Sequence, residues 1–106
     1  MPARIPRRGE VWWVNFGMAA KVRPAVVMSA AYADDDRALI GIIPHTTAAR
    51  GSQYEAVVDV RFLKPGAFMV QGFVNFPPVN FINCIGTLTD AQMQPIEDTL
   101  RRWLAL

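Results

Sequence analysis

Two short segments of this chain end in side chains that could act on a phosphodiester. The first starts with Arg23-Pro24 and continues as an apolar run, and the second ends in Pro44-His45-Thr46-Thr47 after the apolar run 39–43. An arginine can hold two phosphate oxygens at once, a hydroxyl can donate to a third, and a histidine exchanges protons near neutral pH. Together these residue types are the set needed to cleave RNA.

Cleavage of RNA without a metal requires three things: the 2′-hydroxyl must lose its proton, the phosphorane must be stabilised and the leaving 5′-oxygen must be protonated. Arg23 and Thr46 suit the second task. His45 is the only imidazole in the chain and suits proton transfer, as base or as acid. Because side chains alternate along a strand, His45 could share the cleft with Arg23 or turn into the core beneath Thr46.

Basic and aromatic residues predict how RNA is held. Up to Arg23 the chain has five basic residues against one acid, Glu10. Such an excess of positive charge is expected in a segment that binds a polyanion, and equally in a solvated tail. Aromatic rings can stack on unpaired bases, and Trp12, Trp13, Phe16 and Tyr54 are the candidates for this role. Trp12 and Trp13 are adjacent, so they face opposite sides of a strand and at least one belongs to the core. The predicted RNA-binding residues are Lys21, Thr47, Arg50, Trp12, Tyr54 and Gln71.

No metal or other cofactor is expected. The single cysteine, Cys84, excludes an intramolecular disulfide, and one cysteine with one histidine does not make an ordinary structural zinc site. Its apolar setting indicates a buried small side chain. Three consecutive aspartates, 34–36, are read as a solvated loop.

Length and composition predict one compact domain over residues 1–106, with residues 1–8 as a flexible basic N-terminus. Hydrophobic residues make up 52% of the chain and charged residues 19%, so we expect a partner to cover some apolar surface. No apolar run approaches the roughly 20 residues of a membrane-spanning helix, and the N-terminus does not resemble a signal peptide. We therefore expect a cytoplasmic protein without a membrane partner.

The pattern of the chain predicts a mainly β fold. Alternating and β-branched runs separated by Gly/Pro turns, one of them Lys64-Pro65-Gly66, favour several short strands. Thr89 and Gln92 form a capping box that opens a C-terminal helix with apolar residues at helical spacing. We therefore expect a small antiparallel barrel packed against that helix. The predicted strands are 10–16, 23–29, 39–43, 54–60, 67–75 and 84–88.

The order of these segments carries a family resemblance. Gly9-Glu10-Val11-Trp12, Arg23-Pro24-Ala25-Val26, Pro44-His45-Thr46-Thr47 and Tyr54-Glu55-Ala56-Val57, in this order, resemble the MazF/PemK family of toxin endoribonucleases from about Gly9 to the C-terminus. The resemblance implies an SH3-like barrel of the MazF/PemK/CcdB type, found as a homodimer with RNA along the interface. It also implies metal-independent, sequence-preferring cleavage of single-stranded RNA, restraint by a cognate antitoxin, and catalytic roles for Arg23 and Thr46.

The chain also departs from that family. The loop 17–22 has neither a carboxylate nor an amide, and Val70 stands before Gln71 where many members have an aspartate. Three explanations stay open: His45 substitutes for the missing acid, the nuclease is weak or specialised, or the chain has become a binding protein. The alternative functions are a non-catalytic toxin that acts on a protein, as gyrase poisons of similar fold do, and a generic nucleic-acid-binding barrel.

Overall fold

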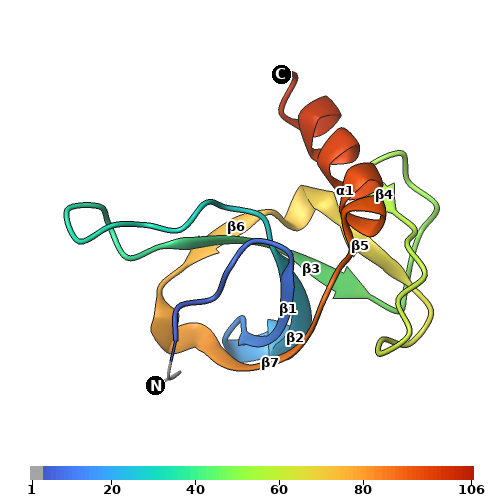
Figure 1. The fold of residues 1–106 in the computed structure, drawn as a ribbon. Coiled ribbons are helices and arrows are strands. Elements are labelled where there is room, and N and C mark those ends of the chain that lie inside the picture. Colours follow the sequence, from blue (N-terminus) through green and yellow to red (C-terminus); the bar gives the residue numbers. More distant parts are fainter. Residues whose placement is uncertain (1–3) are drawn as a thin grey trace.

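The computed structural model describes residues 4–106, apart from the side chain of residue 20. Over this range the chain forms seven strands, three single 3₁₀ turns and one α-helix (Figure 1). The strands are β1 (Glu10–Asn15), β2 (Val22–Val27), β3 (Ile40–Thr46), β4 (Glu55–Ala56), β5 (Ala67–Met69), β6 (Val74–Phe76) and β7 (Phe81–Thr87). The 3₁₀ turns are η1 (Met18–Ala20), η2 (Val70–Gly72) and η3 (Pro78–Asn80), and the α-helix is α1 (Asp90–Trp103).

All strand pairs are antiparallel, and the sheet runs in the order β4-β5-β3-β2-β1-β7. One edge of β3 pairs with β2, whereas its other edge pairs with β6 over its first half and with β5 at its end. The sheet therefore branches at β3 and curves around the core (Figure 1). The predicted fold class, an antiparallel barrel-like sheet with one C-terminal helix, is confirmed.

Alternation along the strands divides the buried side chains into two clusters. Val11, Val26 and Ile43 pack with Phe68 and with the buried face of α1. The neighbouring positions in the same strands, such as Trp12, Val27 and Ile42, pack on the other side around Phe81. Since the side-chain period of a strand is two, the same strands line both clusters.

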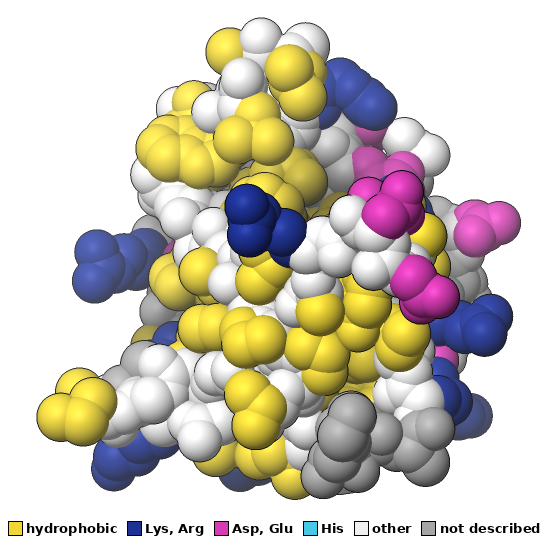
Figure 2. Space-filling model, turned by 90° about the vertical axis from the view of Figure 1, so that its left-hand side faces the viewer, with side chains coloured by type: hydrophobic (Ala, Val, Ile, Leu, Met, Phe, Trp, Pro, Cys, Tyr) yellow, Lys and Arg dark blue, Asp and Glu magenta, His cyan; other side chains and the backbone are white. Residues whose placement is uncertain are grey.

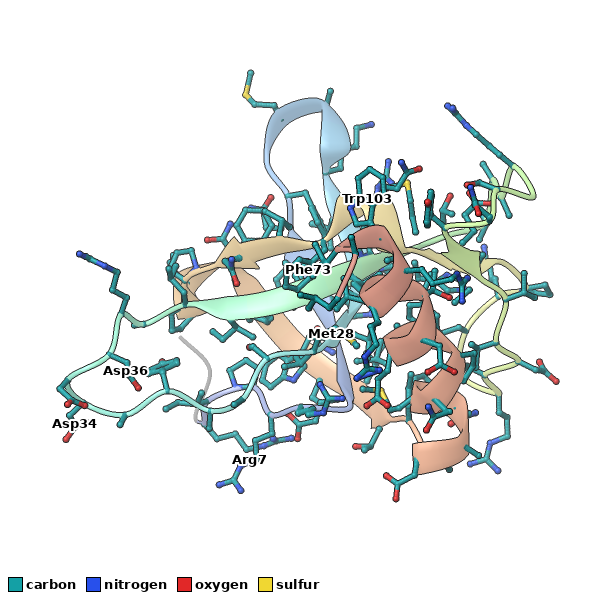
Figure 3. All side chains as sticks on the ribbon, turned by 90° about the horizontal axis from the view of Figure 1, so that it is seen from above. Arg7, Met28, Asp34, Asp36, Phe73 and Trp103 are labelled. Carbon is teal, nitrogen blue, oxygen red and sulfur yellow. The ribbon has the colours of Figure 1, made fainter. Side chains whose placement is uncertain are left out.

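The helix α1 begins as predicted. The Thr89 hydroxyl accepts a hydrogen bond from the Gln92 backbone N–H, and the Gln92 side chain accepts one from the Thr89 N–H. Gln92 also donates through Nε2 to the Asp59 carbonyl at 2.9 Å, which joins the start of the helix to the loop after β4. Met28 and Phe73 lie beside the helix, and Trp103 lies at its last turn (Figure 3).

Two predicted strands are shorter than expected. The strand predicted over 54–60 is limited to Glu55 and Ala56, and the loop 57–66 that follows contains the turn at Pro65. The strand predicted over 67–75 is divided by η2 into β5 and β6. At the break, Gly72 lies against Pro44 and Met69 so closely that a Cβ would stand 2.8 Å from Pro44 Cγ. The break redirects the chain so that both halves pair with β3.

The N-terminal segment contacts the barrel from residue 4 onward. The Glu10 carboxylate accepts hydrogen bonds from the Arg7 N–H at 2.8 Å and from Trp12 Nε1 at 3.0 Å, and it pairs with the Arg4 guanidinium. Arg8 pairs with Glu97 on α1. Burial alone would raise the pKa of Glu10, but these three donors together lower it. Three residues of the segment predicted as a flexible tail, Arg4, Arg7 and Arg8, therefore make hydrogen bonds or ion pairs with the rest of the domain, while residues 1–3 lie outside the described part of the chain.

The connection between β2 and β3 extends away from the barrel (Figure 1). Asp34 and Asp36 lie at its tip, far from the helix (Figure 3). Figure 2 looks at the left-hand side of Figure 1, where hydrophobic side chains cover much of the face and acidic side chains gather in its right half. No helix in the described range is long and apolar enough to cross a membrane.

Candidate active site

The residues proposed for catalysis line one cavity of about 520 Å³ at the ends of β2 and β3. Arg23 and Pro24 contribute from β2, and His45 and Thr46 contribute from β3. The remaining lining comes from Trp13 of β1 and from the loops after β3 and β4. The lining residues are Trp13, Arg23, Pro24, His45, Thr46, Thr47, Ala48, Phe62, Leu63 and Lys64.

Strand register explains why Arg23 and Thr46 line the same cavity. Ala25 pairs with Pro44 as the last pair of the β2–β3 ladder, and Arg23 and Thr46 lie two residues beyond it, one on each strand. Side chains two residues apart in a strand point to the same side, and both Arg23 and Thr46 border the cavity. On its other edge β2 pairs with β1, where Val14 is opposite Arg23. β1 therefore supports Arg23 from that side.

The hydroxyl of Thr46 is oriented by the backbone that follows it. Its Oγ1 accepts a hydrogen bond from the Ala48 N–H at 3.0 Å. A hydroxyl has one hydrogen to donate in addition to its acceptor sites, so this bond leaves the Thr46 hydrogen available for a ligand in the cavity. Thr46 can thus donate to an oxygen of a bound phosphate.

His45 both packs against the core and borders the cavity. The residue is 5% exposed, and its ring meets Phe68 edge-on at 5.0 Å between centroids. Gly66 lies against the same ring, since a Cβ there would stand 2.9 Å from His45 Cε1. Burial lowers the pKa of His45 below its ordinary value. Burial thus favours the neutral imidazole, and a neutral imidazole can accept a proton.

Among the lining residues outside the predicted site, three carry side chains that could contact RNA, and of these only Trp13 is among the aromatic residues weighed for stacking. Lys64 brings a second positive charge to the cavity, and Trp13 and Phe62 bring aromatic rings. The Lys64-Pro65-Gly66 run was interpreted only as a turn, although loops often carry functional side chains.

The predicted role of Trp12 in stacking on RNA is wrong. Trp12 is 3% exposed, packs edge-to-face on Phe81 and donates through Nε1 to Glu10, so neither face of its ring can receive a base. Trp13, on the opposite side of β1, is 37% exposed and lines the cavity. Alternation predicted that one tryptophan is core, and only the packing shows which one.

The other predicted RNA-binding residues divide into two groups. Thr47 lines the cavity. Lys21, Arg50 and Gln71 are exposed but lie outside its lining, and the Arg50 N–H donates to the Glu55 carboxylate at 2.9 Å. Tyr54 also lies outside the lining, because its ring packs on Trp103 with 5.0 Å between centroids.

The acidic and thiol side chains stand apart from this cavity. Within residues 4–106, no three or more His, Cys, Asp or Glu side chains are grouped so that they could hold a metal ion. Cys84 is half-buried and directs its Sγ to the Gly86 carbonyl at 3.5 Å. The groups that border the cavity are thus cationic, hydroxyl, imidazole and aromatic, which suits a polyanion with aromatic bases.

Comparison with known proteins agrees with this geometry. Residues 7–104 match the family model described as PemK-like, MazF-like toxin of type II toxin-antitoxin system. The probable endoribonuclease MazF5 of Mycobacterium tuberculosis is 35% identical in an alignment 102 residues long, with 87% of this chain and 86% of that protein covered.

Solved structures share the fold at lower identity. An endoribonuclease in complex with its cognate antitoxin, from a mycobacterial species, superposes with a TM-score of 0.81 at 20% identity and covers 95% of this chain and 96% of that one. A MazE-MazF structure from Deinococcus radiodurans gives a TM-score of 0.80 at 19% identity, with 97% and 98% covered. The match of a family model to nearly the whole chain, with a curated relative above 30% identity, shows that this chain belongs to the PemK-like and MazF-like toxins of type II toxin–antitoxin systems.

Proposed function

We propose that this toxin is a metal-independent, sequence-preferring endoribonuclease that cleaves single-stranded RNA in the cavity between β2 and β3. The observation that carries the proposal is one cavity that Arg23, Thr46, His45 and Lys64 all line. The relative named as a probable endoribonuclease supports the same activity.

Each side chain has a distinct task in this reaction. Arg23 binds two oxygens of the scissile phosphate and stabilises the charge that develops as the 2′-oxygen attacks phosphorus. Thr46 donates its free hydroxyl hydrogen to the same phosphate. Lys64 adds a positive charge that attracts the RNA backbone.

His45 is the proposed general base. Because burial lowers its pKa and favours the neutral imidazole, His45 can take the proton of the 2′-hydroxyl. As the 2′-oxygen bonds to phosphorus, the bond to the 5′-oxygen breaks and that oxygen takes up a proton from water. His45 thereby supplies the proton acceptor that the loop 17–22 and Val70 lack.

Cleavage of RNA in the presence of EDTA tests this proposal, with Arg23→Ala as the decisive variant. Removal of one donor to a developing oxyanion typically costs about 10²–10³-fold in rate, so Arg23→Ala should lower cleavage by at least about 100-fold. Arg37→Ala, on the connection between β2 and β3 and outside the cavity lining, is the matched control and should cleave normally. Cleavage by Arg23→Ala within a few-fold of wild type would reject the proposed site.

The same experiment separates the alternatives. A protein-binding toxin would arrest growth without cutting RNA in EDTA, and its toxicity would survive Arg23→Ala. A generic nucleic-acid binder would retain RNA without cleaving it and would not arrest growth. An endoribonuclease loses cleavage and toxicity together when Arg23 is removed.

We also propose the partners and the location of this toxin. A cognate antitoxin should bind it and block cleavage, as the two antitoxin complexes of similar fold suggest. A homodimer should form in the cytoplasm and bury on the order of 1,200–2,000 Å². The hydrophobic share of 52% leads us to expect such an interface. Light scattering at working concentration should give twice the mass of one chain, and a monomer would reject the dimer.

A further inference from the structure

A second cavity, of about 340 Å³, lies next to the candidate active site, and Arg23 lines both. Its other walls come from Phe16 after β1, from Pro44 of β3 and from the segment that runs from β5 to β6. The lining residues are Phe16, Arg23, Pro44, Met69, Gly72, Val74 and Phe76. The proposed function uses none of these except Arg23.

The lining of this second cavity, which we name the apolar cavity, suits a flat ring. Phe16 and Phe76 meet edge-to-face, with 5.3 Å between ring centroids and 84° between planes. Gly72 packs against Met69 and Pro44, where an added Cβ would stand 2.9 Å from Met69 Cε, so this wall has little freedom to move. Arg23 is the one charged side chain among the lining residues.

We propose that the apolar cavity holds the base of a nucleotide next to the scissile phosphate, an inference that rests on the proposed function. Arg23 connects the two cavities, so a phosphate bound to its guanidinium has one neighbouring nucleoside on the side of Phe16 and Phe76. Aromatic and apolar walls bind the face of a base, which every base has. The lining offers no side chain other than Arg23 to read the edge of a base, so this cavity contributes affinity more than sequence preference.

Binding of oligonucleotides that cannot be cleaved tests the apolar cavity apart from catalysis. The probes are 2′-O-methyl heptamers of uridine and of adenosine and an abasic backbone of the same length. The variant Phe76→Leu keeps most of the apolar volume but removes the aromatic face. Tyr32→Leu is the matched control, because Tyr32 packs on the same core cluster as Phe76 but lines neither cavity. Phe16→Leu repeats the test if Phe76→Leu melts below the assay temperature.

Stacking on an aromatic side chain is worth about 5-fold to 150-fold in affinity per base. Phe76→Leu should weaken binding of both base-bearing heptamers by at least about 5-fold and leave binding of the abasic backbone within twofold of wild type. Tyr32→Leu should change neither, whereas Arg23→Ala should weaken all three probes.

Three results would overturn the apolar cavity as a base site: equal effects of Phe76→Leu and Tyr32→Leu, equal losses on abasic and base-bearing probes, or no binding of the heptamers by wild type. Cleavage of RNA in EDTA without dependence of binding on Phe76 would reject this site and leave the proposed function in place. Binding that depends on Phe76 in a protein that cuts no RNA would support the base site and reject the proposed function.

Discussion

Gly66 is the position where the fold and the candidate site are most tightly coupled. It directly precedes Ala67, which pairs with Thr46 at the end of β3. A Cβ at residue 66 would stand 2.1 Å from the Thr46 carbonyl oxygen, more than an ångström short of ordinary van der Waals contact, and 2.9 Å from His45 Cε1. The first of these atoms belongs to the backbone of a paired strand, so it cannot move aside as the end of a flexible side chain can.

The substitution Gly66→Ala should therefore damage both stability and catalysis. Overpacking costs about 1–3 kcal/mol where side chains can adjust, and a backbone neighbour places this case at or above the upper value. A domain of this size loses about 4–8 °C in Tm per kcal/mol, so Tm should fall by at least about 10 °C. A displacement of 1 Å at the reacting groups costs about 10²-fold in rate, and we expect a loss of this size in RNA cleavage by the folded variant.

Thermal melting and single-turnover RNA cleavage in EDTA measure the two effects, with Gly51→Ala as the control. Gly51 has φ +73 and no neighbour within 4 Å of an added Cβ. An alanine there carries only the backbone cost of about 1–2 kcal/mol and should cleave RNA at the wild-type rate when folded. If Gly66→Ala melts within 2 °C of wild type and cleaves normally, the close approach of this loop to β3, and the reasoning built on it, is wrong.

Thr46→Val should lower cleavage by about tenfold, less than Arg23→Ala, because a neutral hydroxyl donates a weaker hydrogen bond than a guanidinium; the reverse order in single-turnover rates would exchange their roles. For His45, whose pKa is lowered by burial, the cleavage rate should rise with pH up to that pKa and stay flat above it, and His45→Gln should abolish the rise and most of the rate. A folded His45→Gln variant with near-normal turnover would remove His45 from the mechanism. The pKa of His45 in the folded protein lies below its ordinary value of 6.5. The contribution of His45 to stability is therefore complete above pH 6.5 and declines as the pH falls toward the folded pKa. A plot of Tm against pH should show this decline in wild type and not in His45→Gln. The pKa of Glu10 is also lowered, so its contribution is complete above its ordinary 4.5 and is lost as pH falls through the folded pKa; Glu10→Gln should lower Tm at pH 7 and flatten its dependence on pH in acid, and an unchanged acid profile would contradict the network around Glu10.

Local patterns predicted much of the fold. The alternating run at β1 and the capping box at Thr89 each specify an element through neighbours a few residues away, and both elements form as expected. The strand predicted over 67–75 failed because its division depends on β3, which is distant in sequence and offers one part of its edge to β5 and another to β6. No local pattern reports such a partner.

The candidate site shows the same division. Residue types and their order within a family pattern identified Arg23, His45 and Thr46, since these depend on chemistry that a side chain carries with it. Only the tertiary structure shows that Trp13 and not Trp12 borders the cavity, and that Lys64 lines the same cavity as Arg23. The first depends on which face of β1 is buried and the second on where the loop after β4 lies, and packing between segments that are distant in sequence decides both.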